Sequence, residues 1–205
     1  MKDKLKDIKL IIFDWDGVFN NRYKIDGKSS NFSAVDSMGV NMLRYSFWLK
    51  NGEIPKVAIM SGDKNEMAKE FAEEQNIENV IINCKNKLVG LDNLLQEYQG
   101  AIKPENVAFF FDDILDLKLA EYVKLRIMIS NPALKHLKDF AIKRNLYDYY
   151  TENTGDKNAV REACDNLIKI NNNYDEVVTT RMEFSEKYAE YWKIRGKIVT
   201  SYIKM

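Results

Sequence analysis

Acidic side chains follow two short apolar runs in this chain, in a pattern that suits cation-assisted chemistry. Asp14 and Asp16 come directly after the run at residues 8–13, and the pair Asp112-Asp113 follows the run at residues 107–111. If both runs are parallel strands of one sheet, their carboxyl ends meet at one edge and bring these carboxylates together. Carboxylates gathered in this way repel one another unless a cation neutralises them, and hard oxygen ligands favour Mg²⁺.

A third apolar run, at residues 56–60, is followed by Ser61, Gly62, Asp63 and Lys64. A hydroxyl and a backbone amide next to the start of a helix can hold phosphate oxygens. Asp63 and Lys64, beside them, can contact hydroxyl and carboxylate groups of a substrate. The same edge of the sheet is therefore expected to bind a phosphate ester.

The elements that position these groups alternate along the chain. Continuous apolar runs predict strands buried on both faces, and between them apolar residues recur at helical spacing. The expected strands lie at residues 8–13, 56–60, 79–82, 107–111 and 125–129, and the expected helices at 36–50, 63–76 and 86–98. This alternation predicts an α/β fold, a Rossmann-like parallel sheet with helices on both faces.

Two segments depart from the alternation. Residues 18–33 carry strand-like residues around Asp26-Gly27, which predicts a projecting β-hairpin. After Asn171-Asn172-Asn173, apolar and aromatic residues from Phe184 onward fall near helical spacing, which predicts an amphipathic helix packed on its own domain or on a partner subunit. We therefore expect a main domain at residues 1–170 and a helical extension at residues 171–205.

Composition limits the classes of function. Acidic and basic residues balance at 31 each, so nothing indicates a nucleic-acid or membrane partner. Residues 1–10 lack the apolar stretch of a signal peptide, and no run approaches the roughly 20 apolar residues of a membrane span. Cys84 and Cys164 are far apart and are expected to be reduced thiols. We expect a cytoplasmic enzyme in which His136, the only histidine, lies on the surface.

Four motifs in order give the chain a resemblance to a known family. The sequence from Phe13 to Val18 resembles the first motif of haloacid-dehalogenase-type phosphatases, and Ser61-Gly62 resembles the second. Lys87 resembles the third motif and the segment from Asp112 to Asp116 the fourth, so the likeness spans residues 8 to about 168. This resemblance implies a phosphatase that works through an aspartyl-phosphate.

Phosphate-ester cleavage assigns a role to each of these residues. Asp14 is expected to be the nucleophile, Asp16 the general acid and base, and Lys87 the cation that neutralises Asp14 and the phosphate. By resemblance, Asp14, Asp112 and the backbone carbonyl of Asp16 bind Mg²⁺. Two further carboxylates are expected to orient ligands or water from outside the first coordination sphere. These are Asp113 and Asp116.

The resemblance narrows to small phosphatases without a cap domain, which act on 3-deoxy-D-manno-octulosonate 8-phosphate or on nine-carbon sialic-acid-type 9-phosphates. Members form tetramers in which a neighbour's hairpin and C-terminal segment help to close the site. Residues 35–39 and 155–162 also carry this likeness. Asp63-Lys64 resembles the nine-carbon branch, so a nine-carbon sugar acid is the expected substrate, with the eight-carbon compound as the alternative.

Some residues depart from the family pattern. Phe111 stands where a glycine usually precedes the fourth-motif Asp, Leu115 replaces a usual Asn, and a Gly-rich turn is lost at Asp156 and Asn158. These departures leave open the alternative that the chain is a catalytically weak member of the family and serves as a binding or assembly protein. A receiver-type signalling module is a further alternative, but it would place the acidic pair on the first strand.

Overall fold

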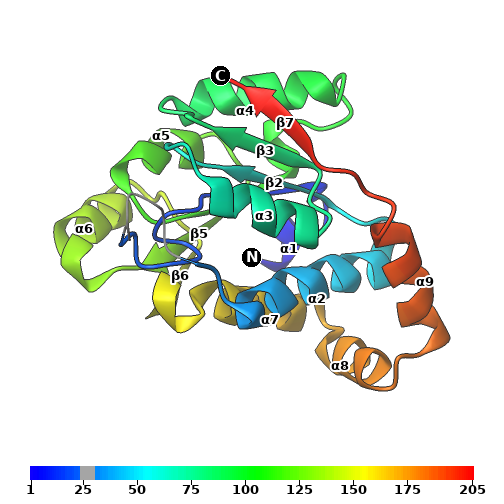
Figure 1. Cartoon of the computed structure of the whole chain (residues 1–205). Coiled ribbons are helices and arrows are strands. Elements are labelled where there is room, and N and C mark those ends of the chain that lie inside the picture. The colour runs from blue at the N-terminus through cyan, green and yellow to red at the C-terminus, as the bar shows by residue number, and fades with distance from the viewer. Residues whose placement is uncertain (24–30) are drawn as a thin grey trace.

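A computed structural model describes residues 1–23 and 31–205 of the chain. Its centre is a seven-stranded sheet in the order β6-β5-β4-β1-β2-β3-β7, in which all neighbours are parallel (Figure 1). The strands are β1 (Leu10–Phe13), β2 (Lys56–Met60), β3 (Asn79–Ile82), β4 (Val107–Phe111), β5 (Leu125–Ser130), β6 (Tyr149–Thr154) and β7 (Ser201–Lys204). The predicted α/β parallel sheet is confirmed.

Successive side chains of the central strands enter two separate cores. Ile11 and Phe13 of β1 pack on one face, whereas Leu10 and Ile12 pack on the other, as strand geometry requires. The first face is covered by α2 (Ala34–Asn51), α3 (Glu66–Glu74) and α7 (Ala159–Asn171). The second face is covered by α4 (Lys87–Glu97), α5 (Leu117–Ala120) and α6 (Lys135–Lys143). Burial on both faces explains why these strands read as continuous apolar runs.

The five predicted strands and three predicted helices are present, with small shifts at their ends. The largest shift is at α3, which begins at Glu66 with Asn65 as its N-cap rather than at Asp63. Residues 61–64 therefore precede the helix by about a turn. β6 and β7 were not predicted, because both are edge strands whose sequences are partly polar and whose pairing depends on the neighbouring strand.

The C-terminal segment is helical, as expected, but ends in a strand. α8 (Tyr174–Met182) and α9 (Glu186–Arg195) follow α7 after Asn172, whose left-handed backbone ends that helix. The helix predicted from Phe184 onward stops at Arg195. The chain then crosses to the sheet and pairs β7 with β3, as the red strand in Figure 1 shows. The division at residue 170 stays a prediction.

The predicted hairpin is only partly described. Its central residues, 24–30, lie outside the described residues, and residues 18–23 and 31–33 form turns and extended chain without a strand. Both cysteines are buried, and they do not form a disulfide with each other. Within the described ranges, no helix combines the length and apolarity that crossing a membrane would require.

Candidate active site

The carboxyl ends of β1 and β4 bring three carboxylates together. β1 and β4 are neighbours, and the amide of Asp14 donates to the carbonyl of Phe110 at 2.9 Å, so Asp14 and Asp112 leave the sheet side by side. Asp116 reaches the same point from the short helix η2 (Ile114–Asp116). One oxygen from each of the three carboxylates lies within 4.8 Å of the others, and all three residues are buried. Asp116, predicted from the sequence to orient ligands or water, therefore lies within this cluster.

Lys87, the first residue of α4, supplies a cation to this cluster. Its Nζ lies 2.6 Å from Oδ1 of Asp14 and also forms an ion pair with Asp116. Only 2% of the Lys87 side chain is exposed. Burial opposes the charge on the ammonium, but Asp116 and Asp14 outweigh it and raise the pKa of Lys87. Lys87 is therefore a permanent cation beside the expected nucleophile.

The cluster holds more negative charge than one lysine balances. Burial raises the pKa of Asp14 to about 7, against the attraction of Lys87, and burial together with the charge of Asp14 raises the pKa of Asp112 well above its usual range. Among the described residues, Oδ2 of Asp112 is buried and has no hydrogen-bond partner. A Cβ at Gly17 would lie only 2.1 Å from that oxygen and 2.6 Å from Nε of Arg22, so glycine is needed for both side chains to approach the backbone here. Clustered hard oxygens and an unsatisfied carboxylate oxygen fit a Mg²⁺ ion.

Asp16 lines the same cavity but is not one of the three clustered carboxylates. Its carboxylate lines a cavity of about 190 Å³, together with Asp14 and Lys87. Oδ2 of Asp16 accepts a hydrogen bond from Nδ2 of Asn65 at 3.2 Å, which orients the carboxylate. Because the side chain is only partly buried, it can exchange a proton with bound substrate or water.

The phosphate-binding residues predicted after β2 are only partly brought to the cavity. Gly62 and Asp63 line it, whereas Ser61 is fully buried and its Oγ accepts from the amide of Asp63 at 3.3 Å. Lys64 is exposed and is not among the residues that line the cavity. Asp63 forms an ion pair with Lys85 at 2.7 Å, so its charge is already partly balanced.

Two basic residues of the cavity, Arg22 and Lys85, were missed by sequence reasoning. Arg22 forms ion pairs with Asp112 and Asp113, although it lies about 90 residues away in the chain. Only its position six residues after Asp16, in the loop that leaves the first strand, could have indicated it. Asp113 also accepts from the amide of Ile114 through Oδ1 at 2.7 Å and so caps η2.

The departures from the family pattern have local explanations. Phe111 points into the core on the α4 side and stacks on Phe109 with ring centroids 5.3 Å apart, away from the cavity. Leu115 lines the cavity and is half exposed. Asn158 adopts a left-handed backbone (φ +61°), which asparagine tolerates better than most residues. Gly155 packs against the carbonyls of Gly17 and Asn20, so this turn supports the loop that carries Asp16.

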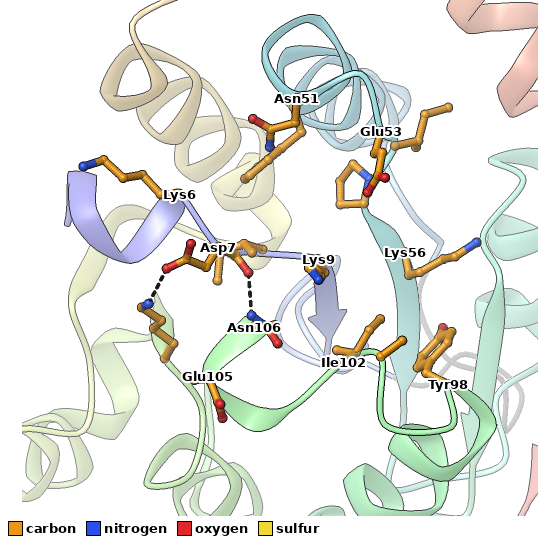
Figure 2. Close-up of a pocket in the computed structure, with 16 residues that line it drawn as sticks. Lys6, Asp7, Lys9, Asn51, Glu53, Lys56, Tyr98, Ile102, Glu105 and Asn106 are labelled. Atoms are coloured by element: carbon orange, nitrogen blue, oxygen red, sulfur yellow. Dashed lines mark hydrogen bonds and ion pairs between the residues drawn. The ribbon is translucent and has the colours of Figure 1, made fainter.

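A larger hollow, of about 690 Å³, lies at the opposite edge of the sheet (Figure 2). It is lined by residues next to the amino ends of β1, β2 and β4, including Lys9 and Lys56. Its charged groups do not converge: Figure 2 shows Lys6 and Lys56 pointing in opposite directions, and Asp7 is paired with Lys124 at 2.9 Å. Size alone does not make it the site, because the clustered ionisable groups lie at the carboxyl edge.

Comparison with known proteins identifies phosphatases that are similar to this chain. No protein-family model matches the chain. It is 30% identical over 177 residues to 3-deoxy-D-manno-octulosonate 8-phosphate phosphatase of Escherichia coli K12, which covers 84% of this chain and 86% of the relative. The enzyme of that name from Salmonella typhi is also 30% identical over 177 residues, with the same coverage.

Solved structures give the same result. The crystal structure of 3-deoxy-D-manno-octulosonate 8-phosphate phosphatase from Moraxella catarrhalis, in complex with a magnesium ion, a phosphate ion and a KDO molecule, matches with a TM-score of 0.70. It is 29% identical, and the match covers 87% of this chain and 96% of that chain. A probable phosphatase from Pseudomonas syringae matches with a TM-score of 0.71 and 29% identity, over 88% of this chain and 96% of that chain.

Proposed function

Since the chain belongs to the haloacid-dehalogenase-type phosphatases, in the 3-deoxy-D-manno-octulosonate 8-phosphate phosphatase branch, we propose that it hydrolyses the phosphate monoester of an eight-carbon 3-deoxy sugar acid through an aspartyl-phosphate on Asp14. The observation that carries this proposal is the buried cluster of Asp14, Asp112, Asp116 and Lys87 at the carboxyl edge of the sheet. We propose Mg²⁺ as its cofactor.

The comparisons favour the eight-carbon alternative over the nine-carbon substrate first expected from Asp63-Lys64. The side chains of Asp63 and Lys64 give the nine-carbon substrate little support. Lys64 is exposed and is absent from the cavity lining, and the Asp63 carboxylate is already paired with Lys85. Neither residue therefore provides a separate argument for the longer sugar.

The proposed reaction has two steps. An oxygen of the Asp14 carboxylate forms a bond to phosphorus while the bond between phosphorus and the sugar oxygen breaks, and Asp16 gives its proton to the departing alkoxide. Asp16 then takes a proton from water, which attacks phosphorus and releases Asp14 and inorganic phosphate. Lys87 stays charged and balances Asp14 and the phosphate throughout.

Asp14, Asp112 and the carbonyl of Asp16 would hold the Mg²⁺ ion, as the family resemblance implies. The bound ion supplies positive charge that offsets the repulsion between the carboxylate and the phosphate. Asp116 already pairs with Lys87 and accepts a hydrogen bond from the amide of Asp113 at 3.1 Å. It is therefore better placed to orient Lys87 than to bind the metal.

Phosphate release from 3-deoxy-D-manno-octulosonate 8-phosphate, with and without Mg²⁺, tests the proposal. We expect turnover that EDTA abolishes and Mg²⁺ restores, and a higher kcat/KM than for a nine-carbon 9-phosphate or a hexose phosphate. Asp14→Asn, in which an amide replaces the nucleophile, should lower kcat at least about a thousandfold. A hydrolysis rate that does not change in Asp14→Asn, or an absence of turnover on every sugar-acid phosphate, would contradict the proposal; the second result would favour a binding or assembly protein.

A further inference from the structure

The guanidinium of Arg22 is bonded to three acceptors of the site. Its Nε donates to the backbone carbonyl of Asp16 at 3.1 Å, and its Nη2 donates to Oδ1 of Asp112 at 2.7 Å. Its Nη1 forms an ion pair with Asp113. Burial opposes the charge on the guanidinium, but Asp112 and Asp113 outweigh it and raise the pKa of Arg22. Arg22 is therefore a fixed positive charge inside the acidic site.

The backbone around Arg22 is arranged to keep the side chain there. Oδ1 of Asn20 accepts from the amide of Arg22 at 2.9 Å and from the amide of Gly17 at 3.3 Å. Arg22 itself has a left-handed backbone, with φ of +64°. This conformation is unfavourable for a residue with a long side chain, and it persists where surrounding interactions hold it. The three bonds of the guanidinium provide such interactions.

Two of the three acceptors are the groups that a divalent cation would use under the proposed function. The Asp112 carboxylate and the carbonyl of Asp16 are both expected ligands of Mg²⁺, and both are bonded to Arg22 here. A guanidinium and a divalent ion at the same two oxygens would repel each other strongly at such short range. The third acceptor, Asp113, is outside the proposed ligand set.

We propose that Arg22 is a tethered cation that occupies the metal position of the metal-free protein, so that a divalent ion has to displace it from Asp112 and from the carbonyl of Asp16. This inference rests on the proposed function. Asp113 can keep one arm of the guanidinium while the other two bonds break. Arg22 thereby reduces repulsion between the carboxylates and lowers the affinity for the metal.

Metal binding measured without substrate tests the inference. Mn²⁺ is the probe, because the electron paramagnetic resonance signal of the free ion reports its Kd directly. We expect Arg22→Gln to bind Mn²⁺ about tenfold more tightly than the wild-type protein. A tenfold change in affinity is of the size usual when two cations compete for the same groups. Arg22→Lys, which keeps the charge but loses the fork of donors, should give an intermediate Kd and serves if Arg22→Gln folds poorly.

Lys85→Gln is the matched control. It removes the same charge from the same cavity, but Lys85 is paired with Asp63, whereas Arg22 is paired with Asp112 of the cluster. Its Kd for Mn²⁺ should change less than about threefold, because exposed charges are well screened. If Lys85→Gln and Arg22→Gln tightened Mn²⁺ binding equally, the effect would come from net charge alone. This result would overturn the proposed displacement of Arg22.

Thermal unfolding gives a second readout. Without metal, Arg22→Gln should have a lower Tm than the wild type, because Asp112 loses its cation. Saturating Mg²⁺ should raise the Tm of this variant more than that of the wild type, since binding to the folded state stabilises it in proportion to the logarithm of the affinity. An equal rise in both proteins would contradict the inference.

The outcomes separate this inference from the proposed function. Wild-type and Arg22→Gln proteins that bind Mn²⁺ with the same Kd, or weaker binding by the variant, would overturn the displacement and leave the metal-dependent phosphatase intact. Failure of both proteins to bind Mn²⁺ at millimolar concentration would overturn the metal site and, with it, the displacement.

Discussion

The Nζ of Lys87 lies 2.6 Å from Oδ1 of Asp14, and the two side chains are almost completely buried. Asp14 directly follows β1, whereas Lys87 is the first residue of α4, the helix that follows β3. This pair explains how the carboxylate that we propose as the nucleophile can remain in a buried site. It also makes the stability of the protein depend on the same residues as its proposed chemistry.

Lys87→Met should destabilise the metal-free protein by about 3–5 kcal/mol at pH 8, because it leaves Asp14 and Asp116 buried without their cation. Urea denaturation in EDTA measures this loss. Lys85→Met, which breaks the more exposed pair with Asp63, should cost less than about 1 kcal/mol and is the control. A Lys87→Met protein within about 1 kcal/mol of the wild type would show that this ion pair is not needed.

Asp16→Ala should slow hydrolysis of a sugar-acid phosphate by about a hundredfold or more, since the departing alkoxide needs a proton. The loss should be much smaller for the first step with an aryl phosphate, whose leaving group is stable without protonation. Burst kinetics on both substrates separate this step from the hydrolysis of the aspartyl-phosphate. Equal losses in the first step on both substrates would remove Asp16 from the role of general acid.

The metal-free protein should lose stability as the pH rises from about 5 to 8. Burial raises the pKa of Asp14 to about 7, that of Asp112 well above its usual range, and that of Asp36 to about 6, against an ordinary value of 3.8. The folded protein therefore binds more protons than the unfolded chain in this window, and the free energy of unfolding falls as the pH rises through the folded pKa values. Carboxyls with a lowered pKa, such as Asp113 and Asp148, add stability as the pH rises through the unfolded value of 3.8, and this gain is nearly complete by about pH 5, so they do not reverse this trend.

Tm measured in EDTA at pH 5 and at pH 8 checks this pH dependence. Mg²⁺ should reduce the difference, because a bound cation favours the ionised carboxylates. Asp14→Asn should also flatten the slope, since one of the three titrating groups is gone. A Tm that stays constant or increases with pH in EDTA would argue against the buried, uncompensated charge.

We predict that the chain forms a homo-oligomer, as expected from the family resemblance. Apolar side chains on the C-terminal helices and on the turn between α8 and α9 are exposed: Met182 at 74%, Phe184 at 52% and Trp192 at 54%. Light scattering at micromolar concentration should give a mass above 23.9 kDa. The double substitution Phe184→Glu and Trp192→Glu should lower that mass, whereas Tyr122→Glu, at an exposed aromatic residue elsewhere, should not. A wild-type monomer would contradict the prediction.

The sequence by itself determined the central architecture and the acidic core of the site. Strands buried on both faces must be continuously apolar, so β1 to β5 could be recognised without any partner. Residues that directly follow such strands must lie at the carboxyl edge, which is why Asp14 and Asp112 could be placed together. Lys87 was found only through its position in the motif order, and the structure brings it to Asp14.

Tertiary structure alone decided the features that depend on contacts between distant segments. β7 pairs with β3 about 120 residues earlier in the chain, and a short partly polar edge strand carries little local signal. Asp116 joins the cluster, and Lys64 stays outside the cavity lining, because of how the loops after β4 and β2 turn. The position of Arg22 on Asp112 depends on one left-handed residue and on a partner about 90 residues away, neither of which periodicity or composition encodes.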